Sequence, residues 1–192
     1  MIAIIKYNGG NVSSVQNSLN RLNVESVVTD DFELIRKADK VIFPGVGEAS
    51  STMKLLKEKG LDQLIPTLRQ PVLGVCLGMQ LMCKNNEEGN TVGMGIFDID
   101  VKKFPAKNIV PHMGWNTISD FKSGIFSGIE ENSHVYFVHS FYCELSENTT
   151  SVCDYILPFS ASLQKNNFYA MQFHPEKSGD VGSRLLENFL KQ

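Results

Sequence analysis

The stretch PVLGVCLGMQ, residues 71–80, decides the expected fold. Its first five residues form a short apolar run, which is typical of a strand buried on both faces of a parallel sheet. The segment LGMQLMCK (77–84) then predicts a helix. Cys76 stands between the two elements, with Gly74 two residues before it and Gly78 two residues after it. We therefore expect a sharp turn from strand to helix, with one thiol at its apex.

The same alternation of strand and helix extends from this turn back to the N-terminus. Apolar runs predict strands at 2–7, 24–28, 41–44 and 71–75. Apolar residues at helical spacing predict helices at 12–22 and 32–38, and another around Met53 and Leu56 that ends at Gly60. A turn is expected at 8–11. This rhythm favours a parallel sheet with helices on both faces.

The second half is richer in strand patterns. Alternating, aromatic and β-branched residues predict strands at 96–104, 115–119, 134–145, 161–165 and 168–173. The last two flank Asn166-Asn167, which predicts a hairpin turn because Asn tolerates positive φ. A final helix is expected at 183–192. We expect one mixed α/β domain over 1–192, with a mainly parallel sheet flanked by helices and additional antiparallel strands in the C-terminal half.

Composition excludes several classes of protein. The net charge is -3 and no basic stripe is visible, which disfavours nucleic acid as a partner. No apolar run approaches the ~18 residues of a membrane span, and the N-terminus lacks a signal-peptide pattern. We therefore expect a cytoplasmic chain whose four cysteines are free thiols. No CxxC pair is present, so we expect no zinc site, and no other metal or cofactor.

The first candidate site is Cys76 itself. In G-x-S-x-G hydrolases, small neighbours permit the strained turn that exposes a nucleophile. GVCLG would lift the Cys76 sulfur out of the sheet and place it at a helix N-terminus, where thiolate is favoured. The N–H of Leu77 would then be free to receive an oxyanion. The alternative is a buried structural cysteine, the usual state of a free Cys.

The second candidate site is QFHPEKS, residues 172–178. His174 and Glu176 follow an expected strand and lie two residues apart. A thiol is only partly ionised at neutral pH, so a cysteine nucleophile needs a base, and that base needs a carboxylate to orient it. Most His-x-Glu pairs are surface residues or structural ones. This pair gains weight because the chain also has a nucleophile elbow.

The third candidate site is FPGVGEAS, residues 43–50, where a strand runs into a glycine-rich loop. Backbone N–H groups near Gly45 and Gly47 would supply a second oxyanion donor or cradle a phosphate. Plain turn glycines are the third interpretation. The other candidates are less specific: three histidines lack metal-ligand spacing, three cysteines suit packed core thiols, and one tryptophan suits either the core or a partner contact. These are His112, His134, His139, Cys83, Cys143, Cys153 and Trp115.

Together these segments resemble the class I (triad) glutamine amidotransferases, which have a flavodoxin-like α/β fold. GVCLGMQ and FHPEKS carry the resemblance, which extends from residue 2 to about 190. Within that family the chain is similar to the glutaminase subunits of imidazole glycerol phosphate synthase. The pointers are PGVG (44–47), Met79, PHMGWN (111–116) and YFVHSFY (136–142).

The resemblance implies a role for each matching residue. Cys76 would attack the side-chain amide of L-glutamine, His174 would activate the thiol and protonate ammonia, and Glu176 would orient His174. Three residues would form the oxyanion hole, and three would hold the amino and carboxylate groups of glutamine. The first set is Gly45, Val46 and Leu77, and the second is Gln80, Ser140 and Phe141.

The resemblance also implies a partner, a separate cyclase subunit with a (β/α)8 barrel that receives the ammonia. The residues expected near it are Asn11, Trp115, Tyr136 and Lys177. Relatives often carry an Asp-Tyr-Gly-like segment where this chain has Lys6-Tyr7-Asn8, which concerns the interface rather than the triad. Alternatives remain open: an amidotransferase serving another synthase, a non-catalytic flavodoxin-like nucleotide-binding module, or an inactive regulatory homologue.

Overall fold

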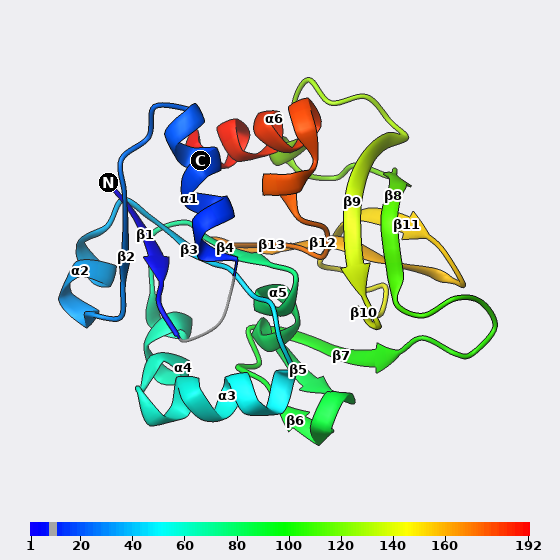
Figure 1. Ribbon diagram of the computed structural model, residues 1–192, viewed down its shortest axis with the longest axis horizontal. Coiled ribbons are helices and arrows are strands. Elements are labelled where there is room, and N and C mark those ends of the chain that lie inside the picture. Colours follow the sequence, from blue (N-terminus) through cyan, green and yellow to red (C-terminus); the bar gives the residue numbers. More distant parts are fainter. Residues whose placement is uncertain (8–10) are drawn as a thin grey trace.

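The computed structural model describes residues 1–7 and 11–192 and is built on a seven-stranded sheet (Figure 1). The strand order is β11-β12-β13-β4-β3-β1-β2. The pairs from β13 to β2 are parallel, and β11 and β12 extend the sheet in the antiparallel sense. The strands are β1 (Ile2–Ile5), β2 (Ser26–Thr29), β3 (Lys40–Phe43), β4 (Val72–Val75), β11 (Thr149–Asp154), β12 (Pro158–Lys165) and β13 (Phe168–Met171).

Helices cover both faces of this sheet. Figure 1 shows α1 and α6 on one face and α3 and α4 on the other. Alternate residues of β1 enter different cores: Ile2 and Ile4 pack on the α1 and α6 side, and Ala3 and Ile5 on the opposite side. Burial on both faces explains why the strands read as continuous apolar runs. The helices are α1 (Val12–Arg21), α2 (Phe32–Lys37), α3 (Ala49–Glu58), α4 (Leu61–Leu64), α5 (Leu77–Met82) and α6 (Gly179–Leu190).

Two smaller sheets accompany the main sheet. One has the order β10-β7-β5-β6, and the other is the antiparallel pair β8-β9. Their strands are β5 (Cys83–Asn86), β6 (Thr91–Val92), β7 (Phe97–Lys103), β8 (His112–Ile118), β9 (Ser133–His139) and β10 (Phe141–Cys143). Four short 3-10 turns complete the described elements: η1 (Ile65–Thr67), η2 (Glu88–Asn90), η3 (Gly124–Phe126) and η4 (Pro175–Lys177).

The structure confirms the predicted fold class, and most element boundaries differ by one to three residues. The hairpin turn is confirmed, since Asn166 has φ 53 and Lys165 pairs with Phe168. The helix predicted over 77–84 is wrong at its end, because Cys83 already belongs to β5 and its backbone pairs with β7. The strand predicted over 134–145 is interrupted at Ser140. The turn predicted at 8–11 falls mainly outside the described residues.

Candidate active site

Cys76 occupies the turn between β4 and α5 with φ 52 and ψ -111. A non-glycine residue at positive φ stores strain on the order of 1–3 kcal/mol, and such strain gathers at functional sites. The flanking glycines are required by space. A Cβ on Gly78 would lie 2.1 Å from the Phe43 carbonyl oxygen, and one on Gly74 would lie 2.9 Å from the Met82 sulfur. The small neighbours that the sequence predicted for this turn are therefore needed for α5 to approach β3 and β4.

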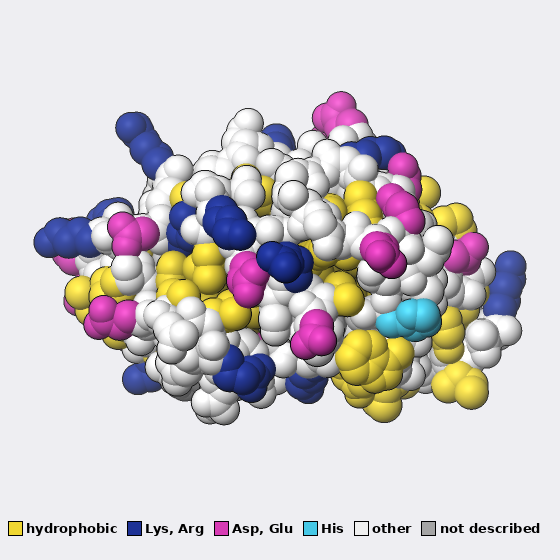
Figure 2. Space-filling view, turned by 90° about the horizontal axis from the view of Figure 1, so that it is seen from above, with side chains coloured by type: hydrophobic (Ala, Val, Ile, Leu, Met, Phe, Trp, Pro, Cys, Tyr) yellow, Lys and Arg dark blue, Asp and Glu magenta, His cyan; other side chains and the backbone are white. Residues whose placement is uncertain are grey.

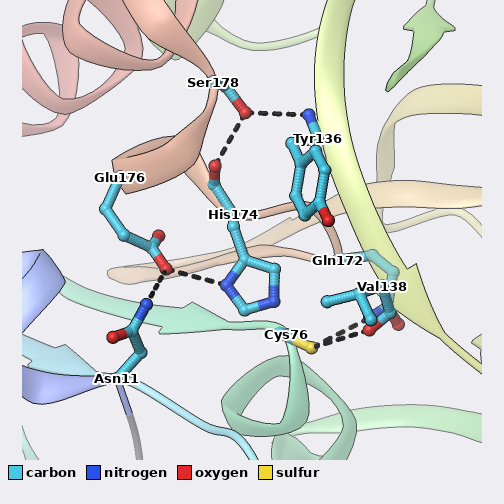
Figure 3. A network of polar contacts seen from close by, with 8 residues as sticks. All are labelled: Asn11, Cys76, Tyr136, Val138, Gln172, His174, Glu176 and Ser178. Carbon is cyan, nitrogen blue, oxygen red and sulfur yellow. Dashed lines mark hydrogen bonds and ion pairs between the residues drawn. The ribbon is translucent and has the colours of Figure 1, made fainter. Parts of the chain in front are cut away.

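His174 and Glu176 reach Cys76 because β13 lies beside β4. The parallel register pairs Met171 with Val75, so both strands end at the same edge of the sheet. The chain leaving β13 then places His174 at the thiol, with one ring nitrogen on Glu176 and the other on the Cys76 side (Figure 3). The distance from His174 Nδ1 to Glu176 Oε1 is 2.8 Å, and both side chains are only 1% exposed.

The charges of the site favour a protonated His174. Burial alone would lower the pKa of His174, but the interactions of its ring with Cys76 and Glu176 outweigh burial and raise that pKa to about 10. The nitrogen Nε2 of His174 is buried without a hydrogen-bond partner in the described structure. It is therefore available to exchange a proton with the thiol or with a bound molecule.

The main chain around His174 is held by β9 (Figure 3). The His174 N–H donates to the Tyr136 carbonyl at 2.9 Å. The Ser178 hydroxyl accepts from the Tyr136 N–H at 3.0 Å and donates to the His174 carbonyl at 2.7 Å. The Asn11 amide donates to Glu176 Oε1 at 3.3 Å. The base and its carboxylate are thus fixed by separate elements on either side.

A cavity of about 430 Å³ opens above the thiol. This volume suits a small ligand. The predicted residues Val46, Cys76, Leu77, Gln80, Ser140, Phe141 and His174 all line it, together with Gly47, Glu88, Pro111, Val138 and His139. Glu88 is the single acidic residue in this lining. Its carboxylate accepts from the Ala49 N–H at 2.8 Å, and burial raises its pKa.

Gln80 is held within the protein by three hydrogen bonds. Its Nε2 donates to the Phe141 carbonyl at 3.1 Å and to Gln172 Oε1 at 3.0 Å, and its Oε1 accepts from Asn86 at 3.1 Å. Gln172 Nε2 in turn lies 3.7 Å from the Cys76 sulfur. Both amide hydrogens of Gln80 are therefore committed to protein acceptors, and this side chain connects the thiol to the Ser140–Phe141 segment.

The residues predicted to form the oxyanion hole lie together, but the carbonyl of the Gly45–Val46 peptide points toward Leu77, where we expected a free N–H group. The Leu77 N–H, which we expected to be free, donates to the Gly45 carbonyl at 3.3 Å. A carbonyl oxygen thus occupies the direction from which Leu77 would stabilise an oxyanion. No residue with a side chain fits at position 45, because a Cβ there would lie 2.3 Å from the Gly78 nitrogen.

The residues expected near a partner fall into two places. Trp115 and Tyr136 make an edge-to-face contact with ring centroids 6.0 Å apart, and the Lys177 ammonium lies 5.9 Å from the Tyr136 centroid. Trp115 is 56% exposed and its neighbour Met113 is 63% exposed. Figure 2 shows apolar side chains on the side of the molecule where β8 and β9 lie. Asn11 instead contacts Glu176 directly.

Sequence reasoning missed Glu88 and Gln172. Glu88 follows β5, whose first two residues we had assigned to a helix and whose strand we had not predicted, so nothing placed Glu88 near Cys76. Gln172 stands two residues before His174, and side-chain alternation along the strand predicted at 168–173 was the signal that could have found it. Among the described residues, no group of three His, Cys, Asp or Glu could hold a metal ion, and no helix is long and apolar enough to cross a bilayer.

Comparison with known families agrees with this geometry. The profile of the family "Glutamine amidotransferase class-I" matches residues 4–192. The chain belongs to the class I glutamine amidotransferases. This confirms the predicted family and disfavours the nucleotide-binding module, since the loop at Gly45 and Gly47 borders the turn that holds Cys76.

Curated relatives narrow the family further. A protein of Bacteroides fragilis named imidazole glycerol phosphate synthase subunit HisH is 61% identical and covers 99% of this chain and 98% of its own length. A protein of the same name from Bacteroides thetaiotaomicron is 59% identical, with 98% of both chains covered. One from Methanococcus maripaludis, named subunit HisH 2, is 42% identical over the full length of both.

Solved structures of the family share the fold. A crystal structure of a glutamine amidotransferase has a TM-score of 0.75 at 19% identity and covers 99% of this chain and 97% of its own. A glutamine amidotransferase from Thermotoga maritima has a TM-score of 0.66 at 16% identity and covers 99% and 82%. At these identities the likeness establishes the architecture alone.

Proposed function

We propose that this chain is the glutaminase subunit of an imidazole glycerol phosphate synthase, and that it hydrolyses L-glutamine to glutamate and ammonia. The observation that carries the proposal is that Cys76 and His174 line one cavity, with the buried Glu176 carboxylate on the other ring nitrogen of His174. Relatives that are 42–61% identical over nearly their whole length carry the name of that synthase's subunit. The single-domain extent, 1–192, is part of the same proposal.

The chemistry follows from the three side chains. The Cys76 thiolate attacks the side-chain carbonyl carbon of glutamine, and a C–S bond forms. His174 Nε2 gives its proton to the departing nitrogen, which leaves as ammonia when the C–N bond breaks. A water molecule then attacks the thioester carbon and His174 takes a proton from it. The C–S bond breaks, which releases glutamate and restores the Cys76 thiolate. Glu176 holds the ring in place and stabilises the imidazolium.

Polar groups at the rim suit the α-amino and α-carboxylate groups of glutamine. The Phe104 N–H donates to the Ser140 carbonyl at 3.0 Å, so the next N–H, that of Phe141, points away from β7. That N–H and the Ser140 hydroxyl are suitable donors to a carboxylate. Glu88 is suited to the ammonium group, and Gln80 acts by holding Phe141 in place.

The oxyanion hole requires one rearrangement. With the Gly45 carbonyl on the Leu77 N–H, the tetrahedral intermediate would meet a lone pair where it needs a donor. Rotation of the Gly45–Val46 peptide would remove that carbonyl and present the Val46 N–H beside the Leu77 N–H. We therefore expect slow hydrolysis by the isolated chain.

The proposed partner is a cyclase subunit with a (β/α)8 barrel, in a heterodimer. The exposed Met113 and Trp115 of β8, with Lys177 over the nearby Tyr136 ring of β9, are suited to such an interface. The ammonia would pass to the partner, which would make imidazole glycerol phosphate and aminoimidazole carboxamide ribotide in histidine biosynthesis. A cytoplasmic location is part of this proposal.

The test is glutamate release from glutamine. The purified chain is assayed alone and then with the cyclase of the same organism and its nucleotide ligand. We expect strong stimulation that is lost in Cys76→Ala and kept in Cys153→Ala, which removes another buried free thiol. Retained activity in Cys76→Ala would refute the triad. A lack of stimulation by a partner that is competent with ammonium salts would point to a different acceptor subunit.

A further inference from the structure

A chain of hydrogen bonds runs from β8 to the rim of the cavity. The Asn116 amide lies 3.2 Å from His112 Nε2, and His112 Nδ1 lies 3.0 Å from His139 Nε2. His139 Nδ1 lies 2.7 Å from the Phe141 carbonyl. His112 and His139, called the histidine pair below, are 3% and 6% exposed. The catalytic steps proposed above use neither ring.

The two ends of this chain fix the direction of every hydrogen bond in it. The Phe141 carbonyl can only accept, so His139 carries its proton on Nδ1 and its Nε2 is an acceptor. His112 must then donate from Nδ1, which leaves its Nε2 as an acceptor. At the far end, the Asn116 amide nitrogen also donates to the Asp154 carbonyl and its oxygen accepts from the Thr117 N–H. This orientation supplies the N–H that His112 Nε2 needs.

The surroundings hold both rings neutral and in place. The His112 ring is stacked between Phe137 and Tyr155, with centroid distances of 4.8 and 4.0 Å. Phe104 and Phe159 enclose the His139 ring. Burial lowers the pKa of His112 to about 4. Burial also lowers that of His139 to about 3, against the raising effect of the Phe141 carbonyl. A stacked, neutral ring with both nitrogens bonded is a rigid support.

The chain ends on a carbonyl that matters to the cavity. The Phe141 carbonyl accepts from two side chains of different elements, His139 Nδ1 of β9 and Gln80 Nε2 of α5. Phe141 begins β10, an edge strand that pairs with β7 through Lys103, so no described strand pairs with it on its other side. Two side-chain donors therefore take the place of a sheet partner at the point where Ser140 and Phe141 line the cavity.

We propose that the histidine pair positions the Ser140–Phe141 segment for glutamine binding, and this rests on the glutamine hydrolysis proposed above. His139 and His112 are positioning residues, because they act on substrate through the Phe141 backbone. Their loss weakens substrate binding more than it slows the chemistry at Cys76.

Substitutions at His139 separate this role from simple core packing. An Asn at this position places its amide nitrogen near that of Nδ1 and keeps the bond to the Phe141 carbonyl. A Gln reaches toward the position of Nε2 and loses it. In the complex with the cyclase, we expect His139→Gln to raise the KM for glutamine at least about fivefold, the range for one buried hydrogen bond, with kcat changed much less. His139→Asn restores most of the KM. His134→Asn, on an exposed histidine of the same strand, is the control.

The tautomers give a second readout that is independent of activity. In ¹⁵N-histidine NMR spectra of the unsubstituted chain, we expect the histidine pair to be protonated on Nδ1 only, whereas free neutral histidine favours Nε2. An Nε2–H ring at either position would overturn the proposal. The proposal would also be overturned if both His139 variants showed the same fall in kcat, the same rise in KM and the same loss of thermal stability. That result would leave His139 with a packing role. Absence of hydrolysis by the unsubstituted complex would overturn the proposed function itself, while the tautomer result would still stand.

Discussion

Ser178→Ala tests how His174, the proposed base, is held. The Ser178 hydroxyl bridges two backbone groups, accepting from the Tyr136 N–H and donating to the His174 carbonyl. Ser178 also precedes α6, but its side chain caps no N–H of that helix. The substitution therefore removes the bridge without removing a helix cap.

The expected cost follows from which groups lose their only partner. The His174 carbonyl keeps the Lys177 N–H at 3.0 Å, so it stays bonded. The Tyr136 N–H is left without its acceptor. One orphaned buried donor costs about 1–3 kcal/mol of unfolding free energy. In a chain of this size that corresponds to a fall in Tm of about 2–12 °C.

The effect on catalysis is expected to be smaller than the loss of the base. The His174 N–H still donates to the Tyr136 carbonyl at 2.9 Å, so the ring stays near the thiol with less restraint. We expect kcat to fall by about threefold to tenfold, well short of the 10²–10⁴-fold of a lost general base.

Urea unfolding and glutamate release measure the two effects. Ser133→Ala is the matched control, because that half-exposed hydroxyl also donates to a backbone carbonyl, that of Glu130. The control is expected to stay within about 0.5 kcal/mol of the unsubstituted chain. Equal losses of stability in the two variants would refute the reasoning from the orphaned Tyr136 N–H.

Three further predictions concern substrate charge, pH and space. Glu88→Gln keeps an acceptor for the N–H at the start of α3 but removes the negative charge. We therefore expect the KM for glutamine to rise about tenfold or more while Tm stays nearly constant. An unchanged KM would exclude contact between Glu88 and the ammonium group of glutamine. Stability in urea is expected to peak near pH 6.5. The lowered pKa values of the histidine pair make the unfolded chain bind more protons below pH 6.5, so stability falls as pH falls toward about 4. The raised pKa of His174 gives the folded chain the extra proton, so that stabilisation is lost as pH rises from 6.5 toward about 10. A stability that is flat from pH 5 to 9 would contradict these shifts. Gly78→Ala places a Cβ against a main-chain carbonyl of β3, and we expect it to destabilise the chain by about 1–3 kcal/mol or more. Gly124→Ala is the control, because a Cβ there meets no atom of the described residues. Equal urea midpoints for the two variants would show that α5 can move.

Local sequence patterns predicted much of the fold because its central strands are short and buried on both faces. The apolar runs at β1, β3 and β4 carry that signal directly. The elbow could be predicted as well, since the glycines around Cys76 report the close approach of α5. His174 and Glu176 could be predicted because they follow a strand and stand at a spacing that suits one ring and one carboxylate.

What could not be predicted depends on long-range register. The end of α5 is set by the pairing of Cys83 with Phe97, which no helix propensity reports. Likewise, His112 and His139 are 27 residues apart and look unrelated in the sequence. The antiparallel register of β8 and β9 makes them direct partners across the ladder. The two histidines can therefore form a hydrogen-bonded chain only because strand pairing brings their side chains together.

The candidate site also shows why the parts differ in how well they could be predicted. The nucleophile, the base and the oxyanion loop follow β4, β13 and β3, which are neighbours in one parallel sheet, and ligands gather at the carboxyl ends of such strands. Each part therefore carries a local motif. The segment that we propose to bind glutamine comes instead from the break between β9 and β10, where two small sheets meet. Its position is set by side chains from other elements, Gln80 and His139, which is why substitutions there should change substrate affinity while the triad stays intact.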